Sequence, residues 1–411
     1  CCQKTHFILH EKTIRGESLP DGFMPMDSFS IDYNNDSHLD FLMFEMQFPP
    51  TFPETYKNVR LIKNNGNGEL ANVTTEVLGD VKSIHARHVS LYDLNNDGFQ
   101  DFIFADHGTD VKPFPGAKSK VFINQQGKSF KQISANKFSN EKAFTFHASM
   151  ADINNDGLGD IYLNNSPFMT HNPAPAVFIQ DQTGKFTKKN NLLPSVLFSG
   201  RVFLASHFFD FDNDGDQDLF LGGADGRDEK NKKDVLLINE KGVLRESSFH
   251  LPDRLEDHRW GTVSVSSSDL NNDGYQDLVL SVHNAGFSKG KLQILMNSKG
   301  QKFTEIKVNL DFKYESSGYW IPWTAIGDLN NDGFDDIVFS VRSKRPTGYR
   351  PIKILLSDSG KEFNDISKQS PAIDNHINGV HLIDFNNDKF LDILITTYSE
   401  KYYIYENMKK W

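Results

Sequence analysis

The sequence predicts an all-β fold, a seven-bladed β-propeller of four-stranded blades. A nine-residue acidic loop recurs seven times, the spacing between copies is nearly constant, and each copy is followed by apolar runs of strand length. The copies begin at Asp32, Asp93, Asp152, Asp210, Asp269, Asp328 and Asp384, which are 61, 59, 58, 59, 59 and 56 residues apart. One period that fills the chain is typical of a repeat architecture. We therefore expect one propeller over residues 1–411 rather than the two or three domains that a length of 411 would suggest.

Each repeat contains the same succession of predicted strands. A short apolar segment precedes the loop, and a second one follows it at once, as in Asp101–Phe104 and Asp277–Leu280. After a variable connection comes a hairpin, as in Val121–Phe130, Ile294–Phe303 and Ile354–Phe363, where apolar runs flank Asn, Ser and Gly turn residues. Helical periodicity is absent. Four strands per repeat, repeated seven times, predict the blades of a propeller.

The two ends of the sequence predict how the ring closes. The last repeat stops after its third strand, Lys401–Glu406, whereas a spare strand, Thr5–His10, precedes the first loop. This N-terminal strand is expected to complete the last blade and to leave no open sheet edge.

The acidic loops are expected to bind Ca²⁺, up to seven ions in all. Oxygen side chains stand at loop positions 1, 3, 5 and 9, position 7 offers a backbone carbonyl, and Gly at position 6 allows the sharp turn, a pattern that suits a hard cation. The loops are residues 32–40, 93–101, 152–160, 210–218, 269–277, 328–336 and 384–392. The expected ligands are Asp32, Asn34, Asp36 and Asp40; Asp93, Asn95, Asp97 and Asp101; Asp152, Asn154, Asp156 and Asp160; Asp210, Asp212, Asp214 and Asp218; Asp269, Asn271, Asp273 and Asp277; Asp328, Asn330, Asp332 and Asp336; and Asp384, Asn386, Asp388 and Asp392.

The alternative for any one copy is an ordinary Asn/Asp/Gly turn, but seven copies with the same spacing favour metal binding. The copies are not equal. Asp212 adds a carboxylate to the fourth loop, which is expected to bind most tightly. Ser37 and Lys389 replace the glycine of the first and seventh loops. A non-glycine residue in the left-handed conformation costs roughly 1–2 kcal/mol, so the sites at Asp32 and Asp384 are expected to be the weakest.

Composition restricts the partners and the compartment. The net charge is −11, and seven bound divalent ions would offset all of it; the short basic runs do not form a nucleic-acid surface. No apolar run reaches the length of a membrane helix. Cys1 and Cys2 are the only cysteines, which excludes a disulfide scaffold. A cysteine at the first position resembles a mature bacterial lipoprotein, so a lipid on Cys1 is the expected means of membrane attachment, the alternative being an arbitrary chain start.

The Asp-x-Asn-x-Asp-Gly-x-x-Asp loop between strands resembles the FG-GAP/VCBS repeats of integrin α-subunit propellers and of many bacterial secreted proteins. The resemblance covers essentially the whole chain and implies Ca²⁺ in the loop that joins the first and second strands of each blade. Because all seven blades have the loop, the bacterial secreted type is more similar than the integrin type. The family includes adhesion modules, lectins and polysaccharide-degrading enzymes, so it implies the fold more firmly than the function.

A ligand is expected on the face opposite the calcium loops, where the connections between second and third strands and between blades are long and variable. His85, Arg87 and His107 lie on these connections. His, Arg and Trp side chains suit sugars, especially acidic ones. The alternative is that each His packs between blades and binds a backbone carbonyl. The candidate ligand-binding residues are His88, His147, His207, Arg259, Trp260, Trp320, Trp323, Arg342 and His381.

The favoured function is a monomeric, extracytoplasmic binding module, secreted or attached to a surface, that recognises a glycan or a partner protein. The first alternative is a polysaccharide lyase acting on a uronate-containing chain, with His88 or His147 as base, Arg259 or Arg342 as the neutralising group and Tyr319 as acid. The second is a structural or assembly subunit. No phosphate-binding loop, CxxC or HExxH motif is present, and nothing singles out a catalytic nucleophile.

Overall fold

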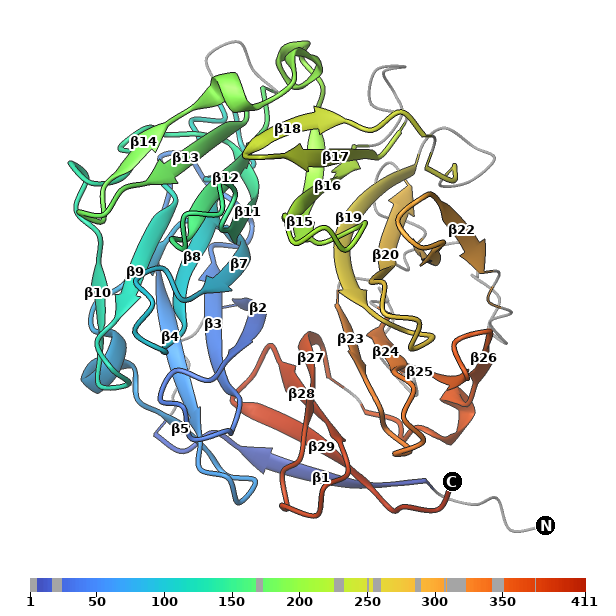
Figure 1. Cartoon of the computed structure of the whole chain (residues 1–411). Helices are drawn as coiled ribbons and strands as arrows, with labels where there is room; N and C mark the ends of the chain where they lie inside the picture. Colours follow the sequence, from blue (N-terminus) through green and yellow to red (C-terminus); the bar gives the residue numbers. More distant parts are fainter. Residues whose placement is uncertain are drawn as a thin grey trace.

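The computed structural model describes residues 6–16, 24–167, 173–224, 233–249, 251–253, 260–284, 290–306, 308, 323–341, 351–373 and 375–411, with only the backbone described at 24–26 and 260. Seven antiparallel sheets stand around a central axis, each with one strand at the centre and one at the periphery (Figure 1). The predicted seven-bladed propeller of four-stranded blades is therefore confirmed.

The four strands of each blade follow one another outwards from the axis. The innermost strands are β2 (Met24–Ile31), β7 (Ala86–Tyr92), β11 (Thr145–Ala151), β15 (Phe203–Phe209), β19 (Trp260–Ser268), β23 (Thr324–Gly327) and β27 (Ile377–Ile383). The second strands are β3 (Asp40–Met46), β8 (Asp101–Asp106), β12 (Asp160–Asn165), β16 (Asp218–Gly223), β20 (Asp277–Asn284), β24 (Asp336–Ser340) and β28 (Asp392–Thr397). The third strands are β4 (Lys57–Asn64), β9 (Lys120–Asn124), β13 (Ala176–Gln180), β17 (Val235–Glu240), β21 (Gly290–Asn297), β25 (Ile352–Asp358) and β29 (Lys401–Asn407).

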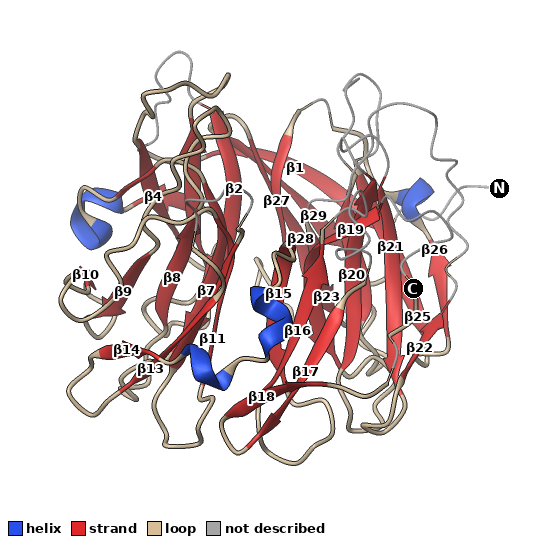
Figure 2. Cartoon of the chain, turned by 90° about the horizontal axis from the view of Figure 1, so that it is seen from above, coloured by secondary structure: helices blue, strands red, loops and turns tan. Residues whose placement is uncertain are grey.

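The outermost strands are short, except in the last blade. They are β5 (Leu70–Asn72), β10 (Phe130–Gln132), β14 (Phe186–Lys188), β18 (Val243–Glu246), β22 (Phe303–Ile306), β26 (Glu362–Asp365) and β1 (Phe7–Thr13). A further strand, β6 (Lys82–Ser83), pairs with β4. The described helical turns are η1 (Thr74–Leu78), η2 (Asn190–Leu192), η3 (Ser195–Phe198) and η5 (Ser367–Gln369), and Figure 2 shows how little of the molecule they occupy beside the strands. Among the described residues, no helix is long and apolar enough to span a membrane.

The second strand of each blade has apolar residues in continuous runs because neighbouring blades cover both of its faces. All six residues of β8, Asp101–Asp106, are buried, as are all six of β12, Asp160–Asn165. The core is accordingly divided into seven clusters, one at each junction of adjacent blades. Such two-sided burial explains why these strands lack the alternation of a half-exposed sheet.

The ring closes through the N-terminal strand, as the sequence predicts. The last sheet has the order β1-β29-β28-β27, and β1 pairs with β29 from Phe7 opposite Asn407 to Thr13 opposite Lys401. The blue β1 and the red β29 lie together in Figure 1. The Tyr402 hydroxyl then donates to the Gly68 carbonyl oxygen (2.9 Å) and ties the last blade to the first.

A β-bulge recurs near the start of the innermost strand in six blades. The register shifts between residues 25 and 27, 86 and 88, 145 and 147, 203 and 205, 262 and 264, and 377 and 379, always six residues before the first aspartate of the loop. A bulge inserts one unpaired residue and redirects its side chain. In the second and third blades the inserted residues are Arg87 and Phe146, which both contact His107.

Candidate metal loops and binding face

The seven acidic loops share one backbone conformation, which their sequence explains. Position 6 is left-handed in every copy, with φ between 85° and 92° at the five glycines. Ser37 (φ 67°) and Lys389 (φ 70°) adopt the same conformation without the freedom of glycine. The asparagine at position 4 is also left-handed throughout, with φ between 54° and 60°, a conformation that asparagine tolerates better than most residues.

Hydrogen bonds from the loop backbone orient the carboxylates of each loop. In the second loop, Asp93 Oδ1 accepts the Asp97 amide hydrogen (3.1 Å) and Asp93 Oδ2 accepts that of Gly98 (2.8 Å). Asp97 Oδ1 accepts the amide hydrogen of Phe99 (3.0 Å). Because the same pattern recurs from loop to loop, the carboxylates at positions 1 and 5 are held by the turn itself.

The aspartate at position 9 is buried beneath each loop. Asp101 is fully buried, its Oδ1 accepts the Asn124 amide hydrogen (2.7 Å), and its Oδ2 accepts that of Leu94 (2.8 Å). Burial raises the pKa of Asp101 to about 7; these two hydrogen bonds oppose the rise, and the nearby Asp97 and Asp93 add to it. The pKa is likewise raised to about 7 at Asp40, Asp160, Asp218, Asp277, Asp336 and Asp392. A cation in the loop would remove this penalty on the ionised form.

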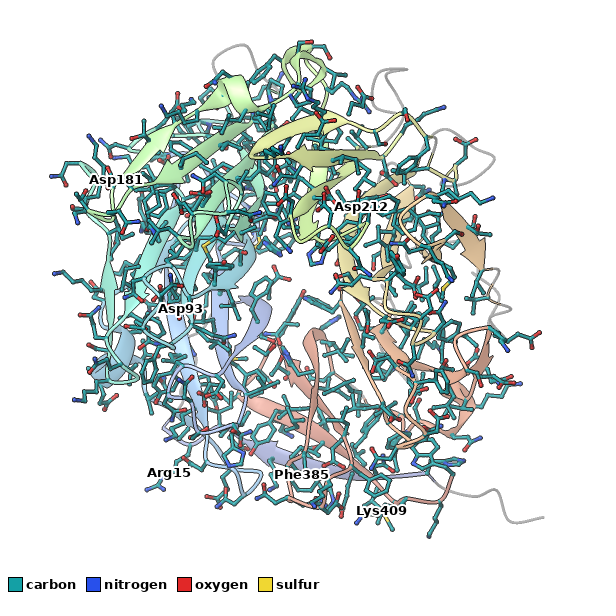
Figure 3. All side chains as sticks on the ribbon, viewed as in Figure 1. Arg15, Asp93, Asp181, Asp212, Phe385 and Lys409 are labelled. Atoms are coloured by element: carbon teal, nitrogen blue, oxygen red, sulfur yellow. The ribbon has the colours of Figure 1, made fainter. Side chains whose placement is uncertain are left out.

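The fourth loop fits a divalent cation best. Asp210 Oδ1 and Asp212 Oδ1 are buried and have no hydrogen-bond partner. One oxygen from each of Asp210, Asp212 and Asp218 lies within 4.8 Å of the others. Figure 3 shows Asp212 closer to the axis of the ring than Asp181, which lies on the outer rim. Carboxylate oxygens without donors, converging in one turn, are the donor set that Ca²⁺ prefers.

The asparagines at position 4 link neighbouring loops around the ring, a role that the sequence analysis did not assign. The Nδ2 groups of Asn35, Asn213, Asn272 and Asn331 donate to the carbonyl oxygen at position 6 of the next loop, at 2.7, 2.7, 2.6 and 3.0 Å. Asn96 donates to Gly157 in the same way, Asn155 donates to the Asp216 carboxylate, and Asn387 donates to the Gly66 carbonyl oxygen (3.0 Å). The sequence signal was the presence of asparagine at position 4 in all seven copies.

The four candidate histidines of the innermost strands bind each other and nearby hydroxyl groups. The rings of His88 and His147 stack with centroids 3.4 Å apart, and His88 Nδ1 donates to the Ala148 carbonyl oxygen (3.0 Å). His207 Nε2 bonds the Ser267 hydroxyl (2.9 Å), and His381 Nε2 bonds the Ser28 hydroxyl (2.8 Å). These contacts agree with the alternative in which the histidines pack between blades.

Burial opposes protonation of these four histidines. Burial lowers the pKa of His88 and of His381 to about 3 and that of His207 to about 4. Burial also lowers the pKa of His147 well below its usual range, and the neighbouring His88 adds to the effect. Among the described residues, His88 contacts Phe29, His147 and the Ala148 carbonyl oxygen, and His147 contacts His88 and the Ser206 hydroxyl. The other residues of the lyase alternative, Arg259, Tyr319 and Arg342, lie outside the described residues.

The remaining candidate ligand residues do not gather in one described site. Trp323 lies just before β23 and packs, partly buried, against the cluster between the sixth and seventh blades. Trp260 begins β19, with its side chain outside the described atoms. Arg259, Trp320, Arg342 and Tyr319 lie outside the described residues, as do Cys1 and Cys2.

The face opposite the acidic loops carries an exposed aromatic stretch that the sequence analysis missed. Of six large hydrophobic side chains exposed in the described structure, three lie between β3 and β4: Phe48 (59% exposed), Phe52 (50%) and Tyr56 (51%). We call residues 47–56 the aromatic loop. The Thr109 hydroxyl donates to the Thr51 carbonyl oxygen (3.0 Å), and Lys142 Nζ lies 3.4 Å from Glu54 Oε1. The aromatic loop therefore leans over the second and third blades.

The fold and the repeated loops define a seven-bladed propeller with an acidic turn between the first two strands of every blade. The chain belongs to the FG-GAP-like repeat family, whose pattern matches residues 32–104, 93–163, 210–280, 269–339 and 328–395. No curated protein matches the chain in sequence.

Solved structures that resemble the chain share its fold at low sequence identity. A lectin from Agrocybe aegerita, described for its specific recognition of non-reducing terminal N-acetylglucosamine, is 16% identical with a TM-score of 0.52, over 83% of this chain and 79% of the lectin. BBS1N, solved in complex with ARL6DN, is 8% identical with a TM-score of 0.53, over 100% and 99% of the two chains. The rhamnogalacturonan lyase YesW is 13% identical over 98% and 75%, but its TM-score of 0.44 is too low to support an argument.

Proposed function

We propose that the protein is a calcium-stabilised binding module that holds a glycan on the face opposite its acidic loops. The observation behind the proposal is the aromatic loop, where Phe48, Phe52 and Tyr56 expose half or more of their surface. Exposed hydrophobic side chains that gather on one part of the surface, unlike scattered single ones, mark interaction sites. Three such rings on one connection offer a sugar several faces on which to stack.

The chemistry around the aromatic loop favours a glycan over an apolar partner. An aromatic ring stacks on the C–H face of a pyranose, and the sugar hydroxyls then need polar groups at the rim. Glu54 and Lys142 form such a rim: the Lys142 side chain is 47% exposed and that of Glu54 is 14% exposed. The lectin among the structural neighbours makes glycan recognition a precedent for this fold, while its 16% identity gives no information on the sugar.

Calcium would serve the structure rather than the ligand. The residues at positions 1, 3, 5 and 9 of each loop would hold the ion, and the carboxylates of Asp210, Asp212, Asp214 and Asp218 make the fourth loop the most favourable of the seven. A bound ion supplies the positive charge that lets these carboxylates stay ionised together, and its binding free energy adds to folding. Loops of this type work at the calcium levels found outside the cytoplasm, which supports an extracytoplasmic location.

A glycan array followed by calorimetry tests the proposed function. The calcium-saturated protein is expected to bind at least one neutral or acidic glycan, and Phe52→Ala and Tyr56→Ala are each expected to weaken it roughly three- to tenfold. Phe198→Ala is the matched control, because Phe198 is an exposed aromatic residue (41%) outside the aromatic loop. Equal losses in all three variants, or no binding to any glycan, would overturn the proposal. Binding to proteins alone would assign the aromatic loop to a protein partner.

A further inference from the structure

Two histidines and one aspartate converge beside Arg87 at the junction of the second and third blades. His85 lies just before β7, and His107 and Asp110 lie on the connection after β8. His107 Nε2 is 3.4 Å from Asp110 Oδ1, and His85 Nδ1 is 3.7 Å from Asp110 Oδ2. His107 is fully buried and His85 is 5% exposed, whereas the Asp110 side chain is 40% exposed. The three side chains thus line a site that is closed on the inside and open to solvent.

The separation of His107 Nε2 from Asp110 Oδ1 (3.4 Å) matches that of two ligands of one metal ion, and His85 Nδ1 lies slightly farther (3.7 Å) from the other Asp110 oxygen. A tetrahedral ion with bonds of about 2.0–2.1 Å separates its ligand atoms by about 3.3–3.4 Å. One oxygen of Asp110 and one nitrogen from each of His85 and His107 lie within 4.8 Å of one another. Small rotations of the exposed Asp110 side chain would bring them to metal-binding distance.

The hydrogen bonds of His107 present the correct nitrogen to a metal. Its Nδ1 donates to the Gly108 carbonyl oxygen (2.7 Å), so its Nε2 carries the lone pair. A metal-binding histidine commonly donates its other nitrogen to a carbonyl in this way. The Nε2 of His85 is buried without a hydrogen-bond partner, so no neighbour fixes its tautomer, and a metal at Nδ1 would leave the hydrogen on this Nε2. Burial lowers the pKa of both histidines well below the usual range, so both are neutral, as ligands must be.

In this structure the Arg87 guanidinium lies where a metal ion would bind. Its Nε donates to His107 Nε2 (2.9 Å), and its NH2 group donates to Asp110 Oδ2 (3.2 Å). Arg87 is the inserted residue of the bulge in β7, and its side chain is 27% exposed, so it can turn towards solvent without disturbing the strand ladder. A site of two neutral imidazoles and one carboxylate holds one positive charge with Arg87 in place and can accept a divalent ion when Arg87 leaves.

We propose that His85, His107 and Asp110 form a binding site for a first-row divalent metal of the zinc class, with Arg87 as the displaceable internal cation. Nitrogen ligands distinguish this site from the acidic loops, which offer oxygen alone and suit Ca²⁺. Three protein ligands leave a fourth position for water or for an oxygen of a ligand. The site lies beside the aromatic loop, which Thr109 contacts at Thr51, but its metal ligands are not the residues proposed to contact the glycan.

Zinc competition against a chromophoric chelator tests the proposal, with untagged protein in excess Ca²⁺ so that the acidic loops are saturated. The protein is expected to bind one Zn²⁺, and Co²⁺ in its place is expected to give the intense visible absorption of a four-coordinate site. His107→Gln and Asp110→Asn are each expected to weaken Zn²⁺ by more than the roughly 10–100-fold that loss of an outer partner costs. Arg87→Gln is expected to tighten it at least about tenfold, because a competing cation is removed.

The control is His376→Gln, because His376 is an exposed histidine of the seventh blade that stacks on Tyr398. Its Zn²⁺ affinity should equal that of the wild type. His107 is buried, so His107→Gln could lose Zn²⁺ because it misfolds. Asp110→Asn tests the site without this risk, since Asp110 is an exposed residue on a connection. The proposal is overturned if Asp110→Asn, folded by circular dichroism, binds Zn²⁺ as the wild type does, or if Arg87→Gln binds it more weakly.

Discussion

Asn213 donates a hydrogen bond from Nδ2 to the carbonyl oxygen of Gly274 at 2.7 Å and so joins the fourth acidic loop to the fifth, 61 residues further along the chain. The same asparagine position makes a bond to the following blade in every loop. The propeller is therefore held by apolar clusters between blades and also by a ring of side-chain bonds on the loop face.

Replacing Asn213 by glycine removes this bond while keeping the left-handed backbone available. Glycine relieves left-handed backbone strain at both positions, so we expect Asn213→Gly to be less stable than Gln126→Gly by about 0.5–1.5 kcal/mol, the usual net value of one hydrogen bond. Chemical unfolding in saturating Ca²⁺ measures the free energy of unfolding of each variant. Gln126→Gly is the matched control, since Gln126 is an exposed left-handed residue (φ 54°) of the β9–β10 turn. Equal effects in the two variants would mean that the bond contributes nothing.

Removing calcium is expected to destabilise the whole ring. Each pair of loop carboxylates then repels by roughly 1 kcal/mol in water, or about 4 kcal/mol at the effective dielectric of a protein surface. Calorimetric melting with and without a chelator should show a large fall in Tm, and Asp210→Asn should lose part of the stabilisation by Ca²⁺. Asp181→Asn, an exposed turn aspartate away from the loops, serves as control. A Tm that is the same with and without the chelator would refute calcium binding by the loops.

Lys389 offers a change expected to stabilise. It holds the left-handed conformation (φ 70°) that five other loops give to glycine, and it places an ammonium group on the seventh loop. Lys389→Gly should raise the free energy of unfolding by roughly 1–2 kcal/mol from backbone strain and should also tighten Ca²⁺ at this loop. Lys241→Gly, at φ 55° in the β17–β18 turn, should reproduce the backbone gain but leave calcium affinity unchanged. A calcium affinity that stays the same in Lys389→Gly would contradict the charge argument.

The fold could be predicted from the sequence because the same acidic loop and flanking strands recur seven times. One loop and one hairpin, repeated at a constant period, predict every blade, and the missing strand after Lys401–Asn407 predicts the closure by β1. The details of the face opposite the acidic loops were not predictable in this way, because its connections differ from blade to blade. His85, His107 and Asp110 come from two connections that only the pairing of β7 with β8 brings together, and Thr109 meets Thr51 across two blades.

The sequence predicts His88, His147, His207 and His381 as ligand residues, but their role depends on neighbours in adjacent blades that the sequence does not reveal. The Ser28 hydroxyl that bonds His381 is 353 residues away and also bonds Thr396 (2.6 Å). Hydroxyl groups and carbonyls of adjacent blades form hydrogen bonds with these imidazoles. The histidines therefore bind other parts of the propeller. This explains why a cluster of histidines at equivalent positions forms an interface between blades.

His381 allows the energetic cost of this interface to be measured through its pH dependence. Its pKa is lowered to about 3 by burial, against about 6.5 in the unfolded chain, so the folded state excludes a proton that the unfolded state binds. The contribution is therefore present above about pH 6.5 and is lost as the pH falls towards 3. At pH 5 the loss for one such group is roughly 2 kcal/mol. Urea unfolding in saturating Ca²⁺ at pH 7.5 and pH 5 should show a smaller difference for His381→Gln than for the wild type. If both proteins lose the same stability, titration of His381 does not control the acid sensitivity of the propeller.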